Sequence, residues 1–276
     1  MLNFLVMSNL HERKSRAETL HEQIVASGFP FPDGLIHLFV GGSELHGAKV
    51  GSTDDLDIYG AYIEPPQWKM GIDGYPHFVW STAGSERRNG PDDVDITLYS
   101  WTKLANLMAK GNPTALHFLM AQNLSGRVDP WDTFIRPKRH LFAARAAAEK
   151  FRGFARAQLR RLKGEGSGKH GQRPEYIGKF GYDTKAAMHI IRLLGEGTEF
   201  MQSGQITLPR PEPEHTLLVS IRTGEFGPLD DLLELADEKF RELADAEAKS
   251  ELPDEVDRTA ISQLVAQTYL KFYTKH

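Results

Sequence analysis

The sequence predicts an α/β (α+β) protein in which a small mixed β-sheet with helices is followed by a mainly α-helical part. Apolar or alternating segments of strand length, separated by turn-forming residues, all lie before residue 100. Beyond them the apolar side chains recur at helical spacing. We therefore expect two domains, residues 1–125 with the sheet and residues 126–276 as a helical domain that closes a substrate cleft.

The first domain is expected to alternate short strands with short helices. Leu20 and Ile24 share one face of an amphipathic first helix. Ser43 and Ser100 are good N-cap residues, and Asn112 caps a further helix that begins with a proline. The predicted strands are 35–40, 55–63, 78–80 and 92–99, and the predicted helices are 11–27, 43–48, 100–110 and 114–122.

The second domain shows amphipathic helical patterns throughout. They predict helices at 141–162, 182–194, 229–248 and 253–274. Between them we expect a basic, glycine-rich loop at 163–179 and a loop or short hairpin at 200–211.

Composition excludes several classes of protein. The 276 residues carry a net charge of −4, so any contact with nucleic acid has to rest on a local basic patch. With no cysteine, disulfides, thiolate metal sites and a cysteine nucleophile are excluded. No apolar run is long enough to span a membrane, and the apolar N-terminus lacks the basic region of a signal peptide. We expect a cytoplasmic protein with no membrane partner, and the oligomeric state stays open.

The candidate site begins where the first strand ends. Gly42 and Ser43 form a turn in which the backbone can approach a phosphate closely. Asp55 and Asp57 lie on one face of the next strand, roughly 7 Å apart, and two such carboxylates repel unless a cation lies between them. Hard oxygen ligands held close together suit Mg²⁺, which keeps waters and substrate phosphates as its other ligands. Taken together, this segment predicts a nucleoside triphosphate site.

A third carboxylate follows on the strand at 92–99. Its apolar residues share one face, and Asp95 lies on the other. Beside Asp55 and Asp57 it would complete an acidic triad and could also act as the general base. Asp93 points the same way and remains a competitor, and a solvated surface aspartate is the ordinary alternative for either residue.

A basic stripe lies on the predicted helix 182–194. Lys185, His189 and Arg192 follow one another at spacings of four and three residues, which places them on one face. Such a stripe is either a solvated face or, across a cleft from the acidic residues, a binding surface for the triphosphate or an acceptor phosphate.

In this order, the Gly-Ser turn, the Asp-x-Asp pair and the later aspartate resemble the signature of the DNA polymerase beta-like nucleotidyltransferase superfamily. More closely, the chain is similar to the RNA ligase-associated, polymerase-like branch of predicted nucleotidyltransferases. That similarity runs from about residue 35 to 226 and includes the segments Asp95–Ser100, Lys110–Pro113, Tyr182–Leu194 and Leu208–Pro211.

The resemblance implies a division of roles among the site residues. Gly42 and Ser43 would contact the triphosphate of an NTP such as ATP, and Asp55 and Asp57 would bind Mg²⁺, or Mn²⁺ in its place. Asp95 would be the third ligand and would activate the acceptor hydroxyl. The departures from the family pattern are Glu44, the pair Leu45-His46 and Asp54, and they bear on the loop geometry and the nucleotide preference.

The leading hypothesis is a Mg²⁺-dependent nucleotidyltransferase that moves an NMP from an NTP to a hydroxyl and releases pyrophosphate. The acceptor is an RNA end, a protein side chain or a small molecule. The alternative is a catalytically silent nucleotide-binding regulatory or interaction protein on the same fold. A nucleic-acid-binding protein without catalysis is less consistent with the acidic net charge.

Overall fold

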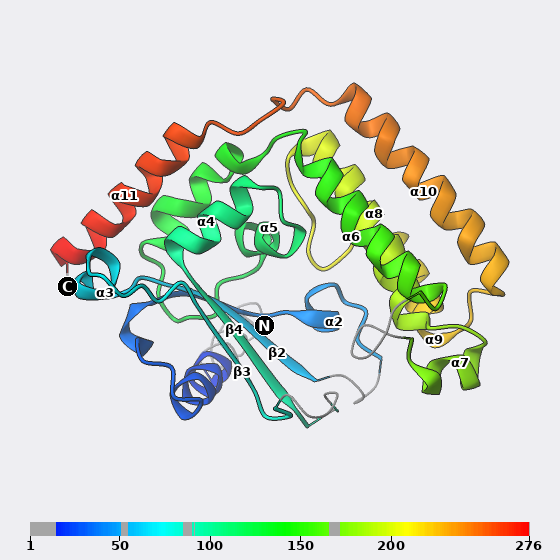
Figure 1. Ribbon diagram of the computed structural model, residues 1–276, viewed down its shortest axis with the longest axis horizontal. Coiled ribbons are helices and arrows are strands. Elements are labelled where there is room, and N and C mark those ends of the chain that lie inside the picture. Colours follow the sequence, from blue (N-terminus) through cyan, green and yellow to red (C-terminus); the bar gives the residue numbers. More distant parts are fainter. Residues whose placement is uncertain (1–14, 51–54, 85–89, 91, 166–171, 276) are drawn as a thin grey trace, which may run out of the picture.

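The computed structural model describes residues 15–50, 55–84, 90, 92–165 and 172–275. It is a mixed α/β protein with one four-stranded sheet, and the helices that follow the sheet rise above it in an arch (Figure 1). Helices α6 (Ala147–Leu162), α8 (Thr184–Ser203) and α10 (Leu229–Lys249) form one side of the arch. Helix α11 (Arg258–Lys275) returns over α4 (Trp101–Ala109) on the other (Figure 1).

The sheet contains all four predicted strands. They are β1 (Leu35–Val40), β2 (Leu56–Tyr62), β3 (His77–Ser81) and β4 (Val94–Ser100), in the spatial order β1-β2-β4-β3. The central pair, β2 and β4, is parallel, and both edge strands pair antiparallel to it. Strand β4 begins two residues later than predicted because residues 92 and 93 belong to the turn that enters it.

Residues 15–26 are helical, and the remaining elements follow in chain order. They are the 3-10 helix η1 (Pro32–Gly34), α2 (Gly42–Leu45), α3 (Pro66–Met70), α4 (Trp101–Ala109), α5 (Pro113–Met120), the π-helix η2 (Trp131–Ile135), the 3-10 helix η3 (Arg136–Phe142), α6 (Ala147–Leu162), α7 (Pro174–Phe180), α8 (Thr184–Ser203), α9 (Glu214–Thr223), α10 (Leu229–Lys249) and α11 (Arg258–Lys275).

Side chains cap the starts of several of these helices. Ser100 Oγ accepts the N–H of Lys103 at 3.3 Å, and Asn112 Oδ1 accepts the N–H of Ala115 at 3.0 Å, so these two predicted helix starts are confirmed. The cap predicted at Ser43 was wrong, because α2 already begins at Gly42 and has no side-chain cap. Asp183 caps α8 in the same way.

The helix predicted from Leu141 was wrong at its start. Residues 136–142 form η3 instead, and α6 begins only at Ala147. The backbone N–H groups of Arg145 and Ala146 donate to Pro253 O and Asp254 O, at 2.8 and 3.1 Å. These long-range bonds engage, with the linker before α11, donors that a helix from Leu141 would use for its own backbone hydrogen bonds.

Two predicted loops contain helix. Pro174 begins α7 within the predicted 163–179 loop, and Gly181, with φ of 84°, ends it; residues 166–171 lie outside the described part of the chain. Helix α8 continues past the predicted end at Leu194 and stops at Gly204, with φ of 68°, inside the predicted 200–211 loop. Helices α3 and α9 were not predicted.

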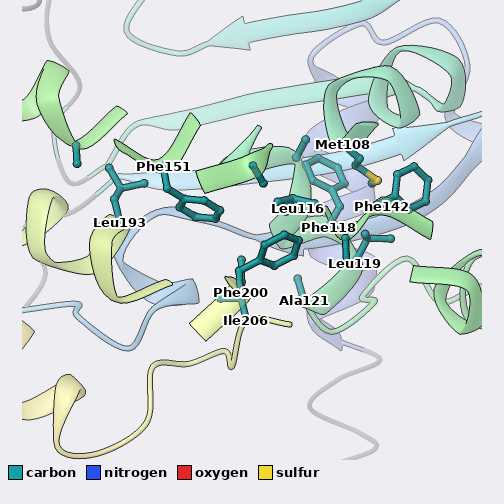
Figure 2. Packing of buried hydrophobic residues seen from close by; sticks show 14 of the residues in the cluster. Met108, Leu116, Phe118, Leu119, Ala121, Phe142, Phe151, Leu193, Phe200 and Ile206 are labelled. Carbon is teal, nitrogen blue, oxygen red and sulfur yellow. The ribbon is translucent and has the colours of Figure 1, made fainter. Parts of the chain in front are cut away.

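Apolar side chains cover both faces of the sheet. One cluster joins Ile58 and Ile96 to Leu20 and Ile24 of the first helix. The other extends from Phe118 of α5, on the opposite face of the sheet, through the helices as far as α11, and Figure 2 shows Phe118, Phe151 and Phe200 within it. Both parts of the chain contribute to this cluster, and the division near residue 125 stays a prediction.

Among the helices that the structure describes, none combines the length and the apolar character that a bilayer span requires.

Candidate active site

Three carboxylates meet at the edge of the sheet where β2 and β4 begin. In the parallel register of these strands Asp57 lies directly opposite Asp95, and Asp55 directly precedes β2. One carboxylate oxygen of each lies within 4.8 Å of those of the other two, and all three residues are half-buried. The expected convergence of Asp55, Asp57 and Asp95 therefore occurs.

The glycine turn after β1 is fitted against Asp57. The Gly41 N–H donates to Asp57 O at 2.8 Å, and Gly42 has a left-handed φ of 59°. A Cβ at Gly42 would lie 2.1 Å from Asp57 Oδ2, and one at Gly41 would lie 2.4 Å from the ring of Tyr59. Glycine is thus required here by both backbone conformation and space, because a side chain would displace the Asp57 carboxylate.

Asp93 does not belong to the acidic triad. It is buried, its Oδ1 accepts a hydrogen bond from Thr82 Oγ1 at 2.7 Å, and its Oδ2 accepts the N–H of Gly90 at 2.7 Å. These bonds hold together the turn between β3 and β4, which is a structural task.

A cleft of about 280 Å³ separates the acidic edge from the helices. Its lining includes Asp55 and Asp57 on the sheet side and Lys185 on α8. All five residues predicted to bind the nucleotide line it, namely Gly42, Ser43, Lys185, His189 and Arg192. The basic stripe of α8 thus lies across the cleft from Asp55 and Asp57, whereas Asp95 is not among the lining residues.

A model of the RNA repair pathway DNA polymerase beta family (RlaP) matches residues 10–268. The chain belongs to this family. Membership in the RlaP family places it among the polymerase beta-like nucleotidyltransferases, in agreement with the resemblance carried by its motifs.

Other comparisons add little to the family match. The chain is similar to a solved nucleotidyltransferase-like protein from Exiguobacterium sibiricum 255-15, with 10% identity and a TM-score of 0.31, over 95% of this chain and 80% of that chain. No curated protein matches it.

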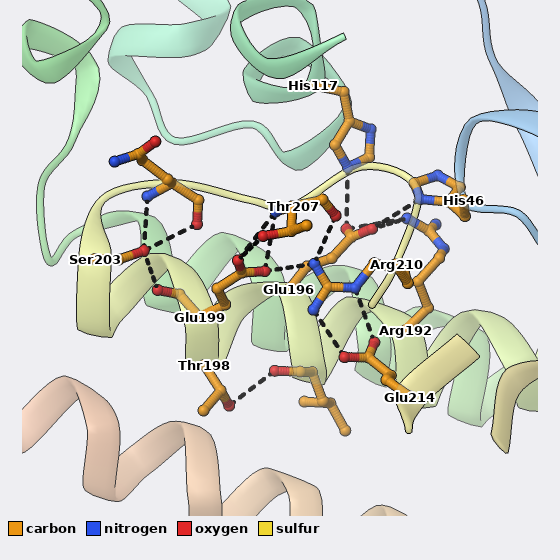
Figure 3. Close-up of polar contacts among 12 residues, drawn as sticks. His46, His117, Arg192, Glu196, Thr198, Glu199, Ser203, Thr207, Arg210 and Glu214 are labelled. Atoms are coloured by element: carbon orange, nitrogen blue, oxygen red, sulfur yellow. Dashed lines mark hydrogen bonds and ion pairs between the residues drawn. The ribbon is translucent and has the colours of Figure 1, made fainter. Parts of the chain in front are cut away.

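In this RlaP-family chain, the helix wall of the cleft is fixed by a buried charge network (Figure 3). Arg192 donates through NH1 to both carboxylate oxygens of Glu196, at 2.8 and 3.0 Å. His117 Nε2 lies 3.0 Å from Glu196 Oε2, and His46 Nδ1 lies 3.0 Å from Glu196 Oε1. The network joins the loop after Ser43 to α5 and α8, so the phosphate-facing turn and the basic stripe are held in one arrangement.

The protonation of this network follows from its burial and charges. Burial by itself would raise the pKa of Glu196, but Arg192 and the two histidines outweigh it and hold that pKa well below its usual range. Burial and the charge of Arg192 lower the pKa of His46 to about 3. Burial, Arg192 and Lys185 likewise hold the pKa of His189 well below its usual range. At neutral pH both rings are therefore uncharged, and Lys185 and Arg192 carry the positive charge of this wall.

His46, His117 and Glu196 resemble a metal-ligand set, since one ligand atom of each lies within 4.8 Å of the others. The guanidinium of Arg192 already balances the Glu196 carboxylate, however, and a metal ion would add uncompensated positive charge beside it in a buried place. We interpret this cluster as a structural ion-pair network.

The segment after α8 supports the same loop from outside. Arg210 is buried and binds Glu214 with two hydrogen bonds, of 3.0 and 2.7 Å, and its backbone N–H donates to His46 O at 3.3 Å. His215 Nε2 lies 2.8 Å from Gly47 O. The Leu208–Pro211 motif thus contributes to the site by bracing residues 46 and 47.

The departures from the family pattern have separate explanations. Glu44 pairs with Arg16 and Lys49 and is not among the residues that line the cleft. His46 is a member of the buried network. Asp54 lies outside the described residues. The sequence offered only weak signals for His117 and Glu196, of which the spacing of Arg192 and Glu196 on one helical face is the clearest.

We expect Glu196→Gln to destabilise the fold by about 3–5 kcal/mol, because it leaves the charge of Arg192 buried without its partner. Asp254→Asn is the matched control: Asp254 pairs with Arg145 at the surface, and its loss should cost at most about 1 kcal/mol. Denaturant unfolding of the three proteins measures both values. Equal small losses would show that the network does not carry the stability of this wall.

His46 also predicts a pH dependence of stability. In the unfolded chain its imidazole binds a proton below about pH 6.5, whereas in the fold it stays neutral down to about 3. The unfolded state therefore gains protons first, and stability falls as the pH drops from 6.5 toward 3, by up to about 1.4 kcal/mol per pH unit for this group.

In a His46→Gln variant the free energy of unfolding should depend less steeply on pH, by up to about 1.4 kcal/mol per pH unit, because this proton is no longer taken up on unfolding. Urea unfolding at pH 7, 6 and 5 tests this, and the difference between variant and wild type separates His46 from the other buried histidines. Parallel stability curves for the two proteins would contradict a neutral, buried His46.

Proposed function

We propose that this protein is a Mg²⁺-dependent nucleotidyltransferase that moves an NMP from an NTP to a hydroxyl acceptor and releases pyrophosphate. The observation that carries the proposal is the convergence of Asp55, Asp57 and Asp95 from two paired strands, within 4.8 Å, beneath a glycine turn. Membership in a polymerase beta family supports it.

The residues present fit a divalent cation. Three carboxylate oxygens are a hard donor set of the kind that Mg²⁺ or Mn²⁺ prefers, and the missing Cβ of Gly42 leaves room for the Asp57 carboxylate. When bound, such an ion supplies positive charge that offsets the charge of the phosphates during transfer. Asp55, Asp57 and Asp95 would hold it.

The chain's own residues orient the nucleotide. Gly42 and Ser43 would contact the triphosphate from the sheet side, and Lys185 and Arg192 would contact it from α8. Glu196 holds Arg192 in place by two hydrogen bonds, and neutral His189 can donate or accept a hydrogen bond without adding charge. Residues 126–276 would thus close the cleft over the bound NTP.

Asp95 would act as the general base. Its carboxylate lies at the entrance of β4, beside Asp57, and would take the proton of the acceptor hydroxyl as that oxygen attacks the α-phosphate. The bond from the α-phosphorus to the bridging oxygen then breaks, and pyrophosphate leaves. The family's description as part of an RNA repair pathway favours an RNA end as the acceptor over a protein or a small molecule.

The proposal is tested by incubating the protein with an α-labelled NTP, Mg²⁺ and an RNA with a free 3′ hydroxyl. Asp57→Asn and Asp95→Asn should each lower transfer of the label by more than about 100-fold, since loss of an outer-shell partner alone costs 10–100-fold. Asp92→Asn is the control, because this neighbouring aspartate is exposed and lies in the turn before β4. It should keep full activity.

Two outcomes would contradict the proposal in different ways. Undiminished transfer by Asp57→Asn and Asp95→Asn would remove the triad from the reaction. NTP binding by the wild type, without label transfer to RNA, protein or small-molecule hydroxyls, would identify a catalytically silent nucleotide-binding protein instead.

A further inference from the structure

An exposed phenylalanine faces the cleft from α6. Phe154 is 40% exposed and lines the cleft, and it belongs to neither hydrophobic cluster of the fold. Phe151, one turn earlier on the same helix, is completely buried in the larger cluster beside Leu193 (Figure 2). Packing of the core therefore accounts for Phe151 but leaves Phe154 without a structural task.

A polar group accompanies this ring one turn further along α6. Gln158 also lines the cleft, and its Oε1 is buried without a hydrogen-bond partner among the described residues. Because an unsatisfied buried acceptor costs stability, such an atom in a cleft indicates that a ligand supplies the donor. Residues four apart on a helix lie on one face, so the ring and the amide present themselves together.

Helix packing places this pair beside the basic stripe. A Cβ at Gly197 would lie 2.9 Å from the Cβ of Phe151, and Arg161 Nε lies 3.7 Å from Asp183 Oδ2. Helices α6 and α8 therefore run antiparallel and side by side, as Figure 1 also shows. The stretch of α6 between these contacts, which carries Phe154 and Gln158, lies alongside the stretch of α8 between Lys185 and Arg192.

We infer that Phe154 and Gln158 form a nucleobase subsite, in which the base stacks on the phenylalanine ring and its edge hydrogen-bonds to the glutamine amide. The inference rests on the proposed function. Cations that suit phosphates lie next to a flat apolar face and an unsatisfied polar group, and a nucleotide carries the complementary parts in the same order. The base belongs either to the incoming NTP or to the nucleotide at the acceptor end.

The test compares Phe154→Leu with the wild type in calorimetric titrations with Mg²⁺. Leucine keeps an apolar side chain but removes the aromatic face, so the fold should stay intact, which thermal unfolding checks. The titrants are a non-hydrolysable NTP analogue, inorganic tripolyphosphate and a short single-stranded RNA with a free 3′ hydroxyl.

We expect Phe154→Leu to weaken binding of the base-carrying ligand about five- to tenfold, within the range for stacking one base on an aromatic ring. Tripolyphosphate binding should not change. A loss confined to the NTP analogue assigns the subsite to the incoming nucleotide, and a loss confined to RNA assigns it to the acceptor. Gln158→Met, which keeps the length of the side chain but not its amide, should weaken the same ligand.

Unchanged affinity for both the NTP analogue and RNA would overturn the subsite, as would an equal loss for tripolyphosphate, which has no base. The proposed function still stands in those cases as long as the wild type binds tripolyphosphate and the NTP analogue. If the wild type binds neither of these two, the nucleotide site itself is refuted and the subsite with it.

Discussion

The parallel pairing of β2 with β4 is the constraint on which the site depends. It sets Asp57 opposite Asp95 and leaves Asp55 at the entrance of the same edge. Three carboxylates held this close repel each other, so the arrangement is costly unless a cation offsets the charge. The fold maintains it through the backbone of two central strands, both paired on each side, whose apolar faces lie in the cores.

On the opposite wall of the cleft, the buried positive charge of Arg192 is balanced by the carboxylate of Glu196. Arg192 is buried in that wall, and Glu196 makes its burial tolerable. Because His46 and His117 both contact the same carboxylate, the loop after the glycine turn, α5 and α8 meet at one buried point. The three aspartates at the sheet edge favour a bound cation, and the helix wall carries the positive charges of Lys185 and Arg192. A polyphosphate between them would be compatible with both.

Local sequence patterns predicted the elements that form through local interactions. The strands at 35–40 and 55–63 and the helix caps at Ser100 and Asn112 follow from alternation and capping, which require only near neighbours. The acidic triad could also be predicted from the sequence, since two strands that each carry carboxylates on one face can pair in few ways that leave those carboxylates apart. The late start of α6 could not be predicted, because it involves a hydrogen bond from the backbone N–H of Ala146 to the backbone carbonyl of Asp254, which is distant in sequence. For the same reason His117 and Glu196, which lie 79 residues apart in sequence, gave no joint signal.

The central claim is that Asp55, Asp57 and Asp95 together bind a divalent cation, and it can be tested without any substrate. Mn²⁺ binding, followed by electron paramagnetic resonance as the loss of the free-ion signal, measures it directly. We predict saturable binding by the wild type that weakens at least about tenfold when Asp95→Asn removes one of the three charged ligands. Equal Mn²⁺ affinity in the two proteins would contradict it.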